Sequence, residues 1–455
     1  MPKKKNIEKN NIYEYDIKNE TNLQINSTKF DYDKDKEIPQ NDIKYDINNY
    51  NIQYFNNFYY INQGQYPLID FYQNYNNSFY IPQNLLNILS EEILHFEENV
   101  DNNLKTIKIY REKIIYDIKK FISKILNKNY EFEFLFYGSY STGLSIELSD
   151  IDILIKFSIK NKNENLNVQQ KIENIISLLE KAFNENREKM KISQVNPIYT
   201  ASVPVLKIEC NLEEIIPKKI QNDLKFNYLF NFENEILKLN FDFTFNECNN
   251  IKERIQIPSQ EIINKIKNVI EIYPNIRPIL LVLKRYMQIT RLNSSFNGGI
   301  SSYSLFLLLY AYYLQYYGNN INDNNNNKNN EENSKQNLGK YLMGFFSFYS
   351  IFNFGNCAID VKKNSPFISL DNMHESCILL IDPITGLNVA KSTFRIEHIK
   401  YVFNAANMII NNAYYEKMNN FGNNEDNNIL NELFKQINNN NYNNIFNPNR
   451  ISIPH

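Results

Sequence analysis

The sequence of 455 residues lacks tryptophan and is poor in glycine, proline, cysteine and histidine, with 11, 14, 4 and 4 of them respectively. The cysteines show no C-x-x-C spacing and the histidines form no ligand pair, which argues against a zinc site and a disulfide framework. Such cysteine usage is typical of a reducing compartment. The longest apolar run, residues 303–317, contains a glutamine and is shorter than the roughly 20 residues that cross a bilayer. We therefore expect no membrane association.

Positive charge is not in excess, because 49 Lys and Arg stand against 51 Asp and Glu, a formal net charge of −2. The chain thus has no overall basic footprint for nucleic acid, although a local basic groove is compatible with this balance. No RRM or zinc knuckle is visible, so we expect RNA affinity to depend on an RNA-binding partner protein. The first residues, Met-Pro-Lys-Lys-Lys, are followed by no apolar region, so we do not expect them to act as a secretory leader. They favour a nuclear location, with a cytoplasmic one as the alternative.

Segments rich in asparagine flank and interrupt the chain. They predict a mostly disordered segment at 1–82, a disordered loop at 319–337 and an Asn-rich tail at 411–455. Elsewhere, apolar residues recur with helical or strand spacing. This periodicity predicts helices at 81–96, 107–126, 166–190, 261–317 and 395–410, and strands at 131–137, 150–157, 201–209 and 236–246.

The order of these elements predicts an α+β fold with two lobes around a cleft. A mixed-sheet catalytic domain is expected at 120–250, and a helical domain is expected from 83–119 together with 251–410. The polar residues 211–235 and 247–260 are expected to be inserted loops.

One stretch joins the end of a predicted strand to the start of the next. The first strand ends at Gly138 and Ser139, where a short helix is expected; glycine allows close backbone approach, and a helix start offers N–H groups to an anion. On the next strand, Asp150 and Asp152 point to the same side. Two carboxylates there repel each other unless a cation lies between them, and oxygen ligands suit magnesium or manganese. The stretch predicts a phosphate cradle facing a metal site; a strand-turn-strand with a solvated acidic turn is the alternative.

A third carboxylate, Asp242, lies within an aromatic run at 241–245 on a later predicted strand. A charge in that setting is destabilising unless it is paired or bound to a metal ion. We therefore expect Asp242 to be paired with a positive charge or to bind a metal ion. A strand-edge carboxylate that faces water is the alternative.

Glycine-serine, a short helix and Asp-x-Asp on the next strand resemble the signature of nucleotidyltransferases of the DNA polymerase beta superfamily. Further runs narrow the resemblance: Val-Pro-Val-Leu-Lys up to Lys207, Leu-Val-Leu-Lys up to Lys284, Gly-Gly-Ile-Ser-Ser-Tyr-Ser from Gly298 and Ile-Asp-Pro from Ile381. In this order they are similar to terminal nucleotidyltransferases of the DNA polymerase sigma type, which include the poly(A) polymerase of the TRAMP complex. The Asp-Pro block resembles the PAP-associated domain, and the similarity covers residues 83–410.

The resemblance implies a polynucleotide adenylyltransferase that adds AMP from ATP to RNA 3′ ends without a template, using two Mg²⁺ or Mn²⁺ ions. Its substrates would be an RNA 3′ end and a nucleoside triphosphate, in RNA processing or decay. The implied roles are ion binding for Asp150, Asp152 and Asp242, phosphate binding for Gly138, Ser139, Lys284 and Ser302, base stacking for Tyr303, and reading of the base edge for the loop with Asp382 and Asn388.

Several alternatives stay open at this point. Lys284 could be an ordinary surface lysine, and Tyr303 could be a core aromatic. Uridylyl-adding relatives often have a histidine just before the asparagine of the Asp-Pro block; here Leu387 precedes Asn388, which favours ATP. The other hypotheses for the function are the same chemistry with UTP, a catalytically silent scaffold in an RNA-processing complex, and nucleotidyl transfer to a small molecule.

Overall fold

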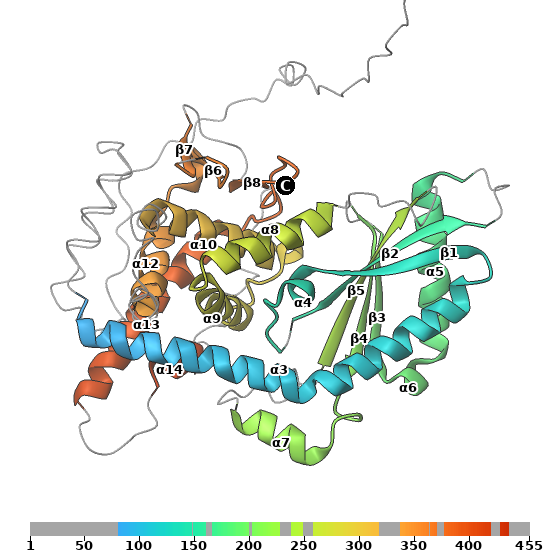
Figure 1. Cartoon of the computed structure of the whole chain (residues 1–455), viewed down its shortest axis with the longest axis horizontal. Helices are drawn as coiled ribbons and strands as arrows, with labels where there is room; N and C mark the ends of the chain where they lie inside the picture. Colours follow the sequence, from blue (N-terminus) through green and yellow to red (C-terminus); the bar gives the residue numbers. More distant parts are fainter. Residues whose placement is uncertain are drawn as a thin grey trace, which may run out of the picture. The chain divides into compact units, whose positions relative to one another are not determined.

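The computed structural model describes residues 81–147, 149–160, 166–199, 203–227, 238–248, 258–317, 337–363, 365–370, 377–419 and 428–435 (Figure 1). All of them belong to one compact unit. The predicted disordered segments at 1–82 and 319–337 lie outside these ranges except at their edges. No helix in the described ranges is long and apolar enough to cross a membrane.

A mixed five-stranded sheet carries the stretch singled out in the sequence. The strands are β1 Tyr130–Tyr137, β2 Ile151–Ile159, β3 Ile192–Ile198, β4 Val205–Asn211 and β5 Lys238–Glu247. Their order is β1-β2-β5-β4-β3, in which β2 and β5 run parallel and the other neighbours run antiparallel. Along β4 and β5, buried positions alternate with partly exposed ones, so one face of the sheet is apolar and the other carries polar side chains.

Two helices supply the apolar cover of this sheet. Helix α5, Val168–Glu185, is amphipathic and begins with a capping box between Asn167 and Gln170. Its buried face shares one hydrophobic cluster with the strands and with the second half of helix α3, Gln83–Leu126. Because this cluster fills one face of the sheet, the polar side chains of the opposite face remain accessible.

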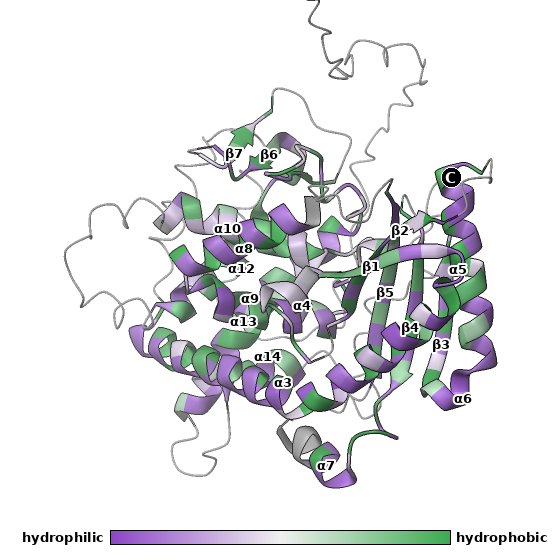
Figure 2. Ribbon diagram, turned by 45° about the vertical axis from the view of Figure 1, so that its right-hand side comes forward, coloured by the Kyte–Doolittle hydropathy of each residue, from purple (hydrophilic) through white to green (hydrophobic). Residues whose placement is uncertain are grey.

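Helix α3 corrects the prediction of two separate helices at 81–96 and 107–126. It is one continuous helix of 44 residues, and hydrophilic and hydrophobic residues alternate along it in Figure 2. Residues 97–106 are mostly polar and interrupt the apolar pattern, but they contain no glycine or proline that would end a helix. From Ile107 onward α3 packs against the sheet, so part of the segment 83–119, expected in the helical domain, contributes to the core of the sheet.

A second, larger hydrophobic cluster combines the first part of α3 with the C-terminal helices. The helices are α8 Pro258–Ile272, α9 Ile276–Ile289, α10 Ser302–Tyr317, α12 Leu338–Ile351, α13 Ile396–Asn419 and α14 Ile429–Lys435. A three-stranded sheet of order β7-β6-β8 accompanies them, with β6 Cys357–Asp360, β7 Phe367–Ser369 and β8 Leu379–Ile381. The mixed sheets and flanking helices confirm the predicted α+β class.

Two further segments differ from expectation. The last helix was expected to end at 410, yet α13 continues to Asn419, and α14 follows inside the predicted Asn-rich tail. Leu433 and Phe434 of α14 are buried, which supplies the apolar contact that holds it. The expected loop at 211–235 contains helix α7, Lys218–Asn227. Short helices α4 Gly138–Thr142 and α6 Arg187–Met190 complete the elements around the first sheet.

Candidate functional site

The turn from β1 into α4 requires a glycine at its first position. Gly138 adopts φ +63°, a left-handed conformation that favours glycine. A Cβ atom there would lie 1.9 Å from Oδ2 of Asp152, so any other residue would collide with that carboxylate. Gly138 is therefore in direct contact with the predicted metal site, and the contact explains why a scarce glycine stands here.

The structure brings the three predicted carboxylates together on the polar face of the sheet. Asp152 of β2 lies directly opposite Asp242 of the parallel strand β5. Asp150 comes two residues before Asp152, and its Oδ1 accepts a hydrogen bond of 3.1 Å from Nδ2 of Asn240 on β5. Burial, followed by the negative charges of Asp242 and Asp150, raises the pKa of Asp152 to about 7. The predicted proximity of the three side chains is thus present in the fold.

Lys207 of β4 supplies the nearest positive charge. It is the register partner of Asp242, and its ammonium donates to Oδ2 of that carboxylate. Burial lowers the pKa of Lys207, but the charge and hydrogen bond of Asp242, together with the charges of Asp150 and Asp152, outweigh it and the net shift is upward. Burial and the charge of Asp150 together raise the pKa of Asp242 in spite of this lysine. One lysine therefore does not neutralise the carboxylate group.

The donor set fits a hard divalent cation. Oδ1 of Asp242 is buried and accepts no hydrogen bond, so it keeps a lone pair for a further ligand. Three carboxylates and no sulfur or imidazole are the donors that magnesium and manganese prefer. Among the described residues, however, no three acidic, histidine or cysteine side chains converge closely enough to form a ready-made ion site. Binding would therefore require the carboxylates to turn toward a common point.

Lys284 lies at the edge of this group and is not the surface lysine of the alternative reading. It belongs to α9 and is only 6% exposed. Its ammonium donates to the carbonyl of Leu144 at 2.6 Å and to Oγ of Ser149 at 3.3 Å. Burial lowers the pKa of Lys284 to about 8, against the opposing effect of Asp152 and Asp150. It holds the loop before the carboxylates, and its contact with a triphosphate stays a prediction.

Tyr303 and Asp382 form a pair that the sequence did not reveal. The Tyr303 hydroxyl donates to Oδ1 of Asp382 at 2.9 Å, and its ring stacks on Phe306 at a centroid distance of 6.5 Å. Asp382 is buried and also accepts hydrogen bonds from the backbone of Ile384 and the hydroxyl of Thr385. Burial and then the charge of Asp382 raise the pKa of Tyr303. In this conformation Asp382 orients the tyrosine and its own turn.

Asn388 is likewise engaged within its own loop. Its Oδ1 accepts from the amides of Leu380 and Ala390, and its Nδ2 donates to the carbonyl of Ile378. Its neighbour Leu387 is 69% exposed. Ser302 is the exposed first residue of α10, while Ser301 provides the helix cap by accepting from the amide of Ser304. The nucleotide contacts of Asn388 and Ser302 therefore stay predictions.

A small pocket of about 160 Å³ extends the carboxylate group toward the sheet edge. The sequence did not single out its polar lining beyond the carboxylates and Lys207. The register explains these neighbours, because Asn196 pairs with Lys207, while Gln194 pairs with Glu209 and Glu209 with Asn240. Strand periodicity puts the side chains of both sets of paired residues on the polar face of the sheet. The lining residues are Asp150, Gln194, Asn196, Lys207, Ile208, Glu209, Asn240 and Asp242.

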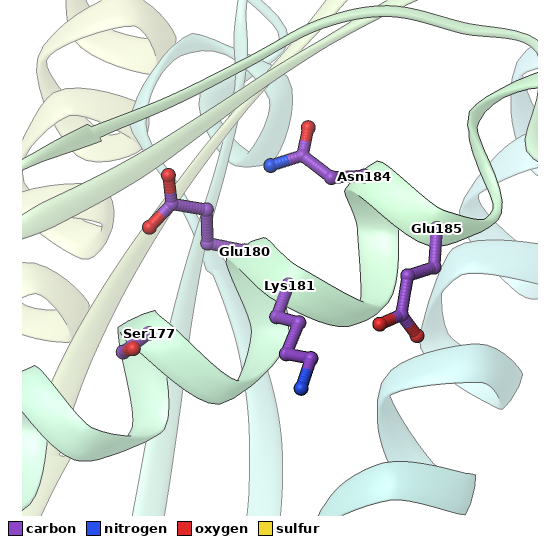
Figure 3. Close-up of a pocket in the computed structure, with 5 residues that line it drawn as sticks. All are labelled: Ser177, Glu180, Lys181, Asn184 and Glu185. Atoms are coloured by element: carbon purple, nitrogen blue, oxygen red, sulfur yellow. The ribbon is translucent and has the colours of Figure 1, made fainter.

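A larger hollow of about 460 Å³ lies elsewhere, along α5. Figure 3 shows that its five lining residues all come from this one helix. Side chains from a single helix make an open surface depression that no second element closes. The chemistry is therefore assigned to the smaller pocket beside the carboxylates. The residues along α5 are Ser177, Glu180, Lys181, Asn184 and Glu185.

Comparison with known families identifies two domains. The family described as "Poly(A) RNA polymerase, mitochondrial-like, central palm domain" matches residues 89–252, which include all three carboxylates. The family described as "Cid1 family poly A polymerase", the PAP-associated domain, matches residues 337–385. These two matches occur in the order that the sequence motifs predict.

Individual relatives agree with this assignment. Poly(A) RNA polymerase gld-4 of Caenorhabditis elegans is 28% identical over 183 residues, 38% of this chain and 20% of that protein. The inactive non-canonical poly(A) RNA polymerase protein Trf4-2 of Drosophila melanogaster is 24% identical over 277 residues, 59% of this chain and 56% of that protein. The matched region thus spans only part of each relative.

Among solved structures, the polymerase core of TRAMP, an RNA surveillance complex, has the same fold. The likeness has a TM-score of 0.53 at 20% sequence identity and covers 77% of this chain and 94% of that one. The chain thus contains a match to the poly(A) RNA polymerase central palm domain and a match to the PAP-associated domain, and it shares the fold of the TRAMP polymerase core.

Proposed function

We propose that this protein adds nucleotides, chiefly AMP from ATP, to the 3′ end of RNA without a template. The observation that carries the proposal is the register of β2 and β5, which sets Asp152 opposite Asp242 with Asp150 two residues away. Such a group of carboxylates is destabilised by its own repulsion, which fits a site built to bind cations. The palm and PAP-associated matches and the relatives named as poly(A) RNA polymerases support it.

Asp150, Asp152 and Asp242 would hold two Mg²⁺ or Mn²⁺ ions. When bound, such ions supply positive charge for the triphosphate and lower the pKa of the attacking hydroxyl. In the reaction, the 3′-hydroxyl of the RNA gives up its proton to the surrounding water and its oxygen bonds to the α-phosphorus. The bond from the α-phosphorus to the oxygen it shares with the β-phosphorus breaks, and pyrophosphate leaves. The residues of the chain then have to align the RNA 3′ end with the triphosphate and keep both substrates out of unproductive positions.

The acceptor end fits the pocket beside Asp242. Its amide side chains, Gln194, Asn196 and Asn240, are neutral groups that can hydrogen-bond to ribose hydroxyls. The nucleotide base fits against Tyr303, whose orientation is fixed by Asp382. Stacking accepts any base and is worth roughly 1–3 kcal/mol, so Tyr303 should set affinity more than identity.

The partner, the compartment and the domain limits are part of the proposal. A formal net charge of −2 favours an RNA-binding partner protein. The TRAMP core, with which this chain shares its fold, belongs to an RNA surveillance complex. We propose a nuclear role in RNA processing or decay. The catalytic domain would combine the expected 120–250 with α3 from Ile107 onward, and the helical domain would combine the earlier part of α3 with 251–410.

An extension assay with each of the four nucleoside triphosphates on a labelled oligoribonucleotide tests the function. We expect extension with ATP above the other three, and no extension by the double variant Asp150→Ala with Asp152→Ala. Removing like charges should not unfold the metal-free protein, so its melting temperature should not fall. Full activity of the double variant at an unchanged melting temperature would contradict the mechanism.

The wild type also separates the alternatives. Preference for UTP would replace the adenylyl assignment with a uridylyl one. No extension with any nucleotide, with or without an RNA-binding protein, would favour a silent scaffold; the Drosophila relative is named as inactive.

A further inference from the structure

The loop between α4 and β2, residues 144–149, links the predicted phosphate contacts to the predicted ion ligands. Gly138 and Ser139 lie just before it, and Asp150 and Asp152 lie just after it. Its residues Leu144 to Glu147 are buried, although a loop on the edge of a site usually faces water. Something must therefore hold this loop inside the molecule.

Glu147 is the most heavily engaged residue of the loop. Its Oε2 accepts a hydrogen bond of 2.5 Å from Nη2 of Arg285 on α9, and the two side chains are 3% and 1% exposed. Its Oε1 accepts from Nδ2 of Asn103 on α3 at 3.1 Å. One carboxylate thus ties the loop to two helices that lie far from it in the sequence.

The neighbouring residue of α9 holds the other side of the same loop. Lys284 donates to the carbonyl of Leu144 and to Oγ of Ser149, which in turn accepts from the amide of Ile146. Ile146 also packs with Val100 of α3 and Leu281 of α9 in a small apolar cluster. Of two adjacent cations of α9, Lys284 therefore fixes both ends of the loop and Arg285 fixes Glu147 within it.

The charges around Glu147 depend on one another. Burial raises the pKa of the Glu147 carboxyl, and the Arg285 guanidinium opposes that shift. Arg111 of α3 is also buried, lies over the ring of Tyr140 on α4, and is attracted by Glu147. Removing the Glu147 charge would leave buried cations uncompensated, and removing Arg285 would leave the carboxylate with weaker partners.

We propose that Glu147 and Arg285 are positioning residues that set the carboxylates of the sheet against the nucleotide-binding residues of the helical part. The inference rests on the proposed function, because it assigns the pair to the placement of that site. A pair that merely stabilised the fold would affect melting alone. A positioning pair must also affect the transition state, since a displacement of about 1 Å can lower a rate roughly 100-fold.

The test compares Glu147→Gln, Arg285→Gln and the double variant in the full chain. Glu147→Gln is isosteric, removes the charge and keeps one of the two acceptor oxygens, so it remains informative if Arg285→Gln fails to fold. Lys171→Gln is the matched control, because Lys171 forms a partly buried ion pair of 2.8 Å with Glu247 away from the loop. The measurements are kcat and KM for ATP, melting temperature, and Mn²⁺ affinity by electron paramagnetic resonance without nucleotide or RNA.

We expect each single variant to lower kcat at least tenfold with less than a threefold change in KM, and to weaken Mn²⁺ binding. The double variant should lose less than the product of the single losses, since two neutral amides can still pair. The control should melt at a lower temperature with unchanged kcat and Mn²⁺ affinity.

Lowered melting temperatures with wild-type kcat and Mn²⁺ affinity would overturn the positioning role. Multiplicative losses in the double variant would overturn the pairing. If the wild type extends no RNA, the proposed function fails instead, and Mn²⁺ affinity alone decides the role of the pair: equal affinity in Glu147→Gln and wild type would refute it.

Discussion

Replacing Gly138 by alanine should abolish most of the activity by displacing a carboxylate. The added Cβ atom would lie 1.9 Å from Oδ2 and 2.8 Å from Cγ of Asp152, whereas ordinary contacts begin at 3.4 Å. The carboxylate would therefore have to retreat by about 1.5 Å. Because a misplacement of about 1 Å can cost roughly 100-fold in rate, we expect kcat for extension to fall about 100-fold or more.

Gly143 provides a matched control at the other end of α4. It adopts φ +76°, close to the +63° of Gly138, but a Cβ atom there meets nothing within 4 Å. Both Gly→Ala variants should lose about 1–2 kcal/mol of stability, because a side chain is unfavourable in this backbone region. Only Gly138→Ala should also show a lower kcat for extension.

The assay is steady-state extension with ATP, accompanied by thermal or urea unfolding of both variants. A fall of 100-fold corresponds to about 2.7 kcal/mol in the activation barrier. Equal losses of kcat in Gly138→Ala and Gly143→Ala would refute the reasoning, because backbone strain alone would then account for both. A Gly138→Ala protein with near wild-type kcat would show that Asp152 moves without consequence.

Three further predictions address individual side chains. The folded-state pKa of Asp152 lies at about 7, above its usual value of 3.8, so its contribution to the stability of the metal-free protein is present at low pH and is lost as pH rises toward 7. Asp152→Asn should flatten that decline in urea unfolding measured from pH 4 to 8, and an unchanged slope would contradict the assignment. Tyr303→Phe removes the hydrogen bond to Asp382 but keeps the ring, so KM for ATP should rise a few-fold at similar kcat. Tyr303→Ala also removes the ring and should raise KM for ATP further. An equal rise in KM in the two variants would argue against stacking. Leu387→His should shift the ratio of kcat/KM for ATP and UTP toward UTP by about tenfold or less, since one hydrogen bond is worth roughly 0.5–1.5 kcal/mol. Leu387→Ala is the control. A wild type that prefers UTP would overturn this expectation.

The central part of the site was predictable because strand periodicity is local information. Asp150 and Asp152 had to share a side of one strand, and a charge within an aromatic run had to find a partner. The family resemblance then placed Asp242 with them, and the register of the two strands agrees. Spacing could not show what a polar side chain faces. Asp382 and Asn388 were expected at a base edge, and both are engaged in hydrogen bonds of their own loop.

Elements with weak local signals were missed for definable reasons. Strand β3 contains Pro197, which argues against a strand, but β3 is the last strand of its sheet and an edge tolerates a residue without an N–H donor. The pairing of Glu147 with Arg285 joins residues 138 positions apart, and no periodicity reports such a contact. Polar residues inside α3 concealed its continuity, because a helix between two cores needs no unbroken apolar face.

Helix α3 contributes to both hydrophobic clusters, and this has a consequence for the order of folding. The sheet cluster uses residues between Ile107 and Phe245, so it can form while later parts of the chain are still being synthesised. The first turns of α3 must wait much longer, because Ser90 and Glu92 bond to Gly339 and Leu430, 249 and 338 positions downstream. Contacts of such long sequence separation form slowly. The N-terminal end of this helix is therefore among the first described segments to leave the ribosome and among the last to be buried. During that interval its apolar side chains are exposed and can bind a chaperone.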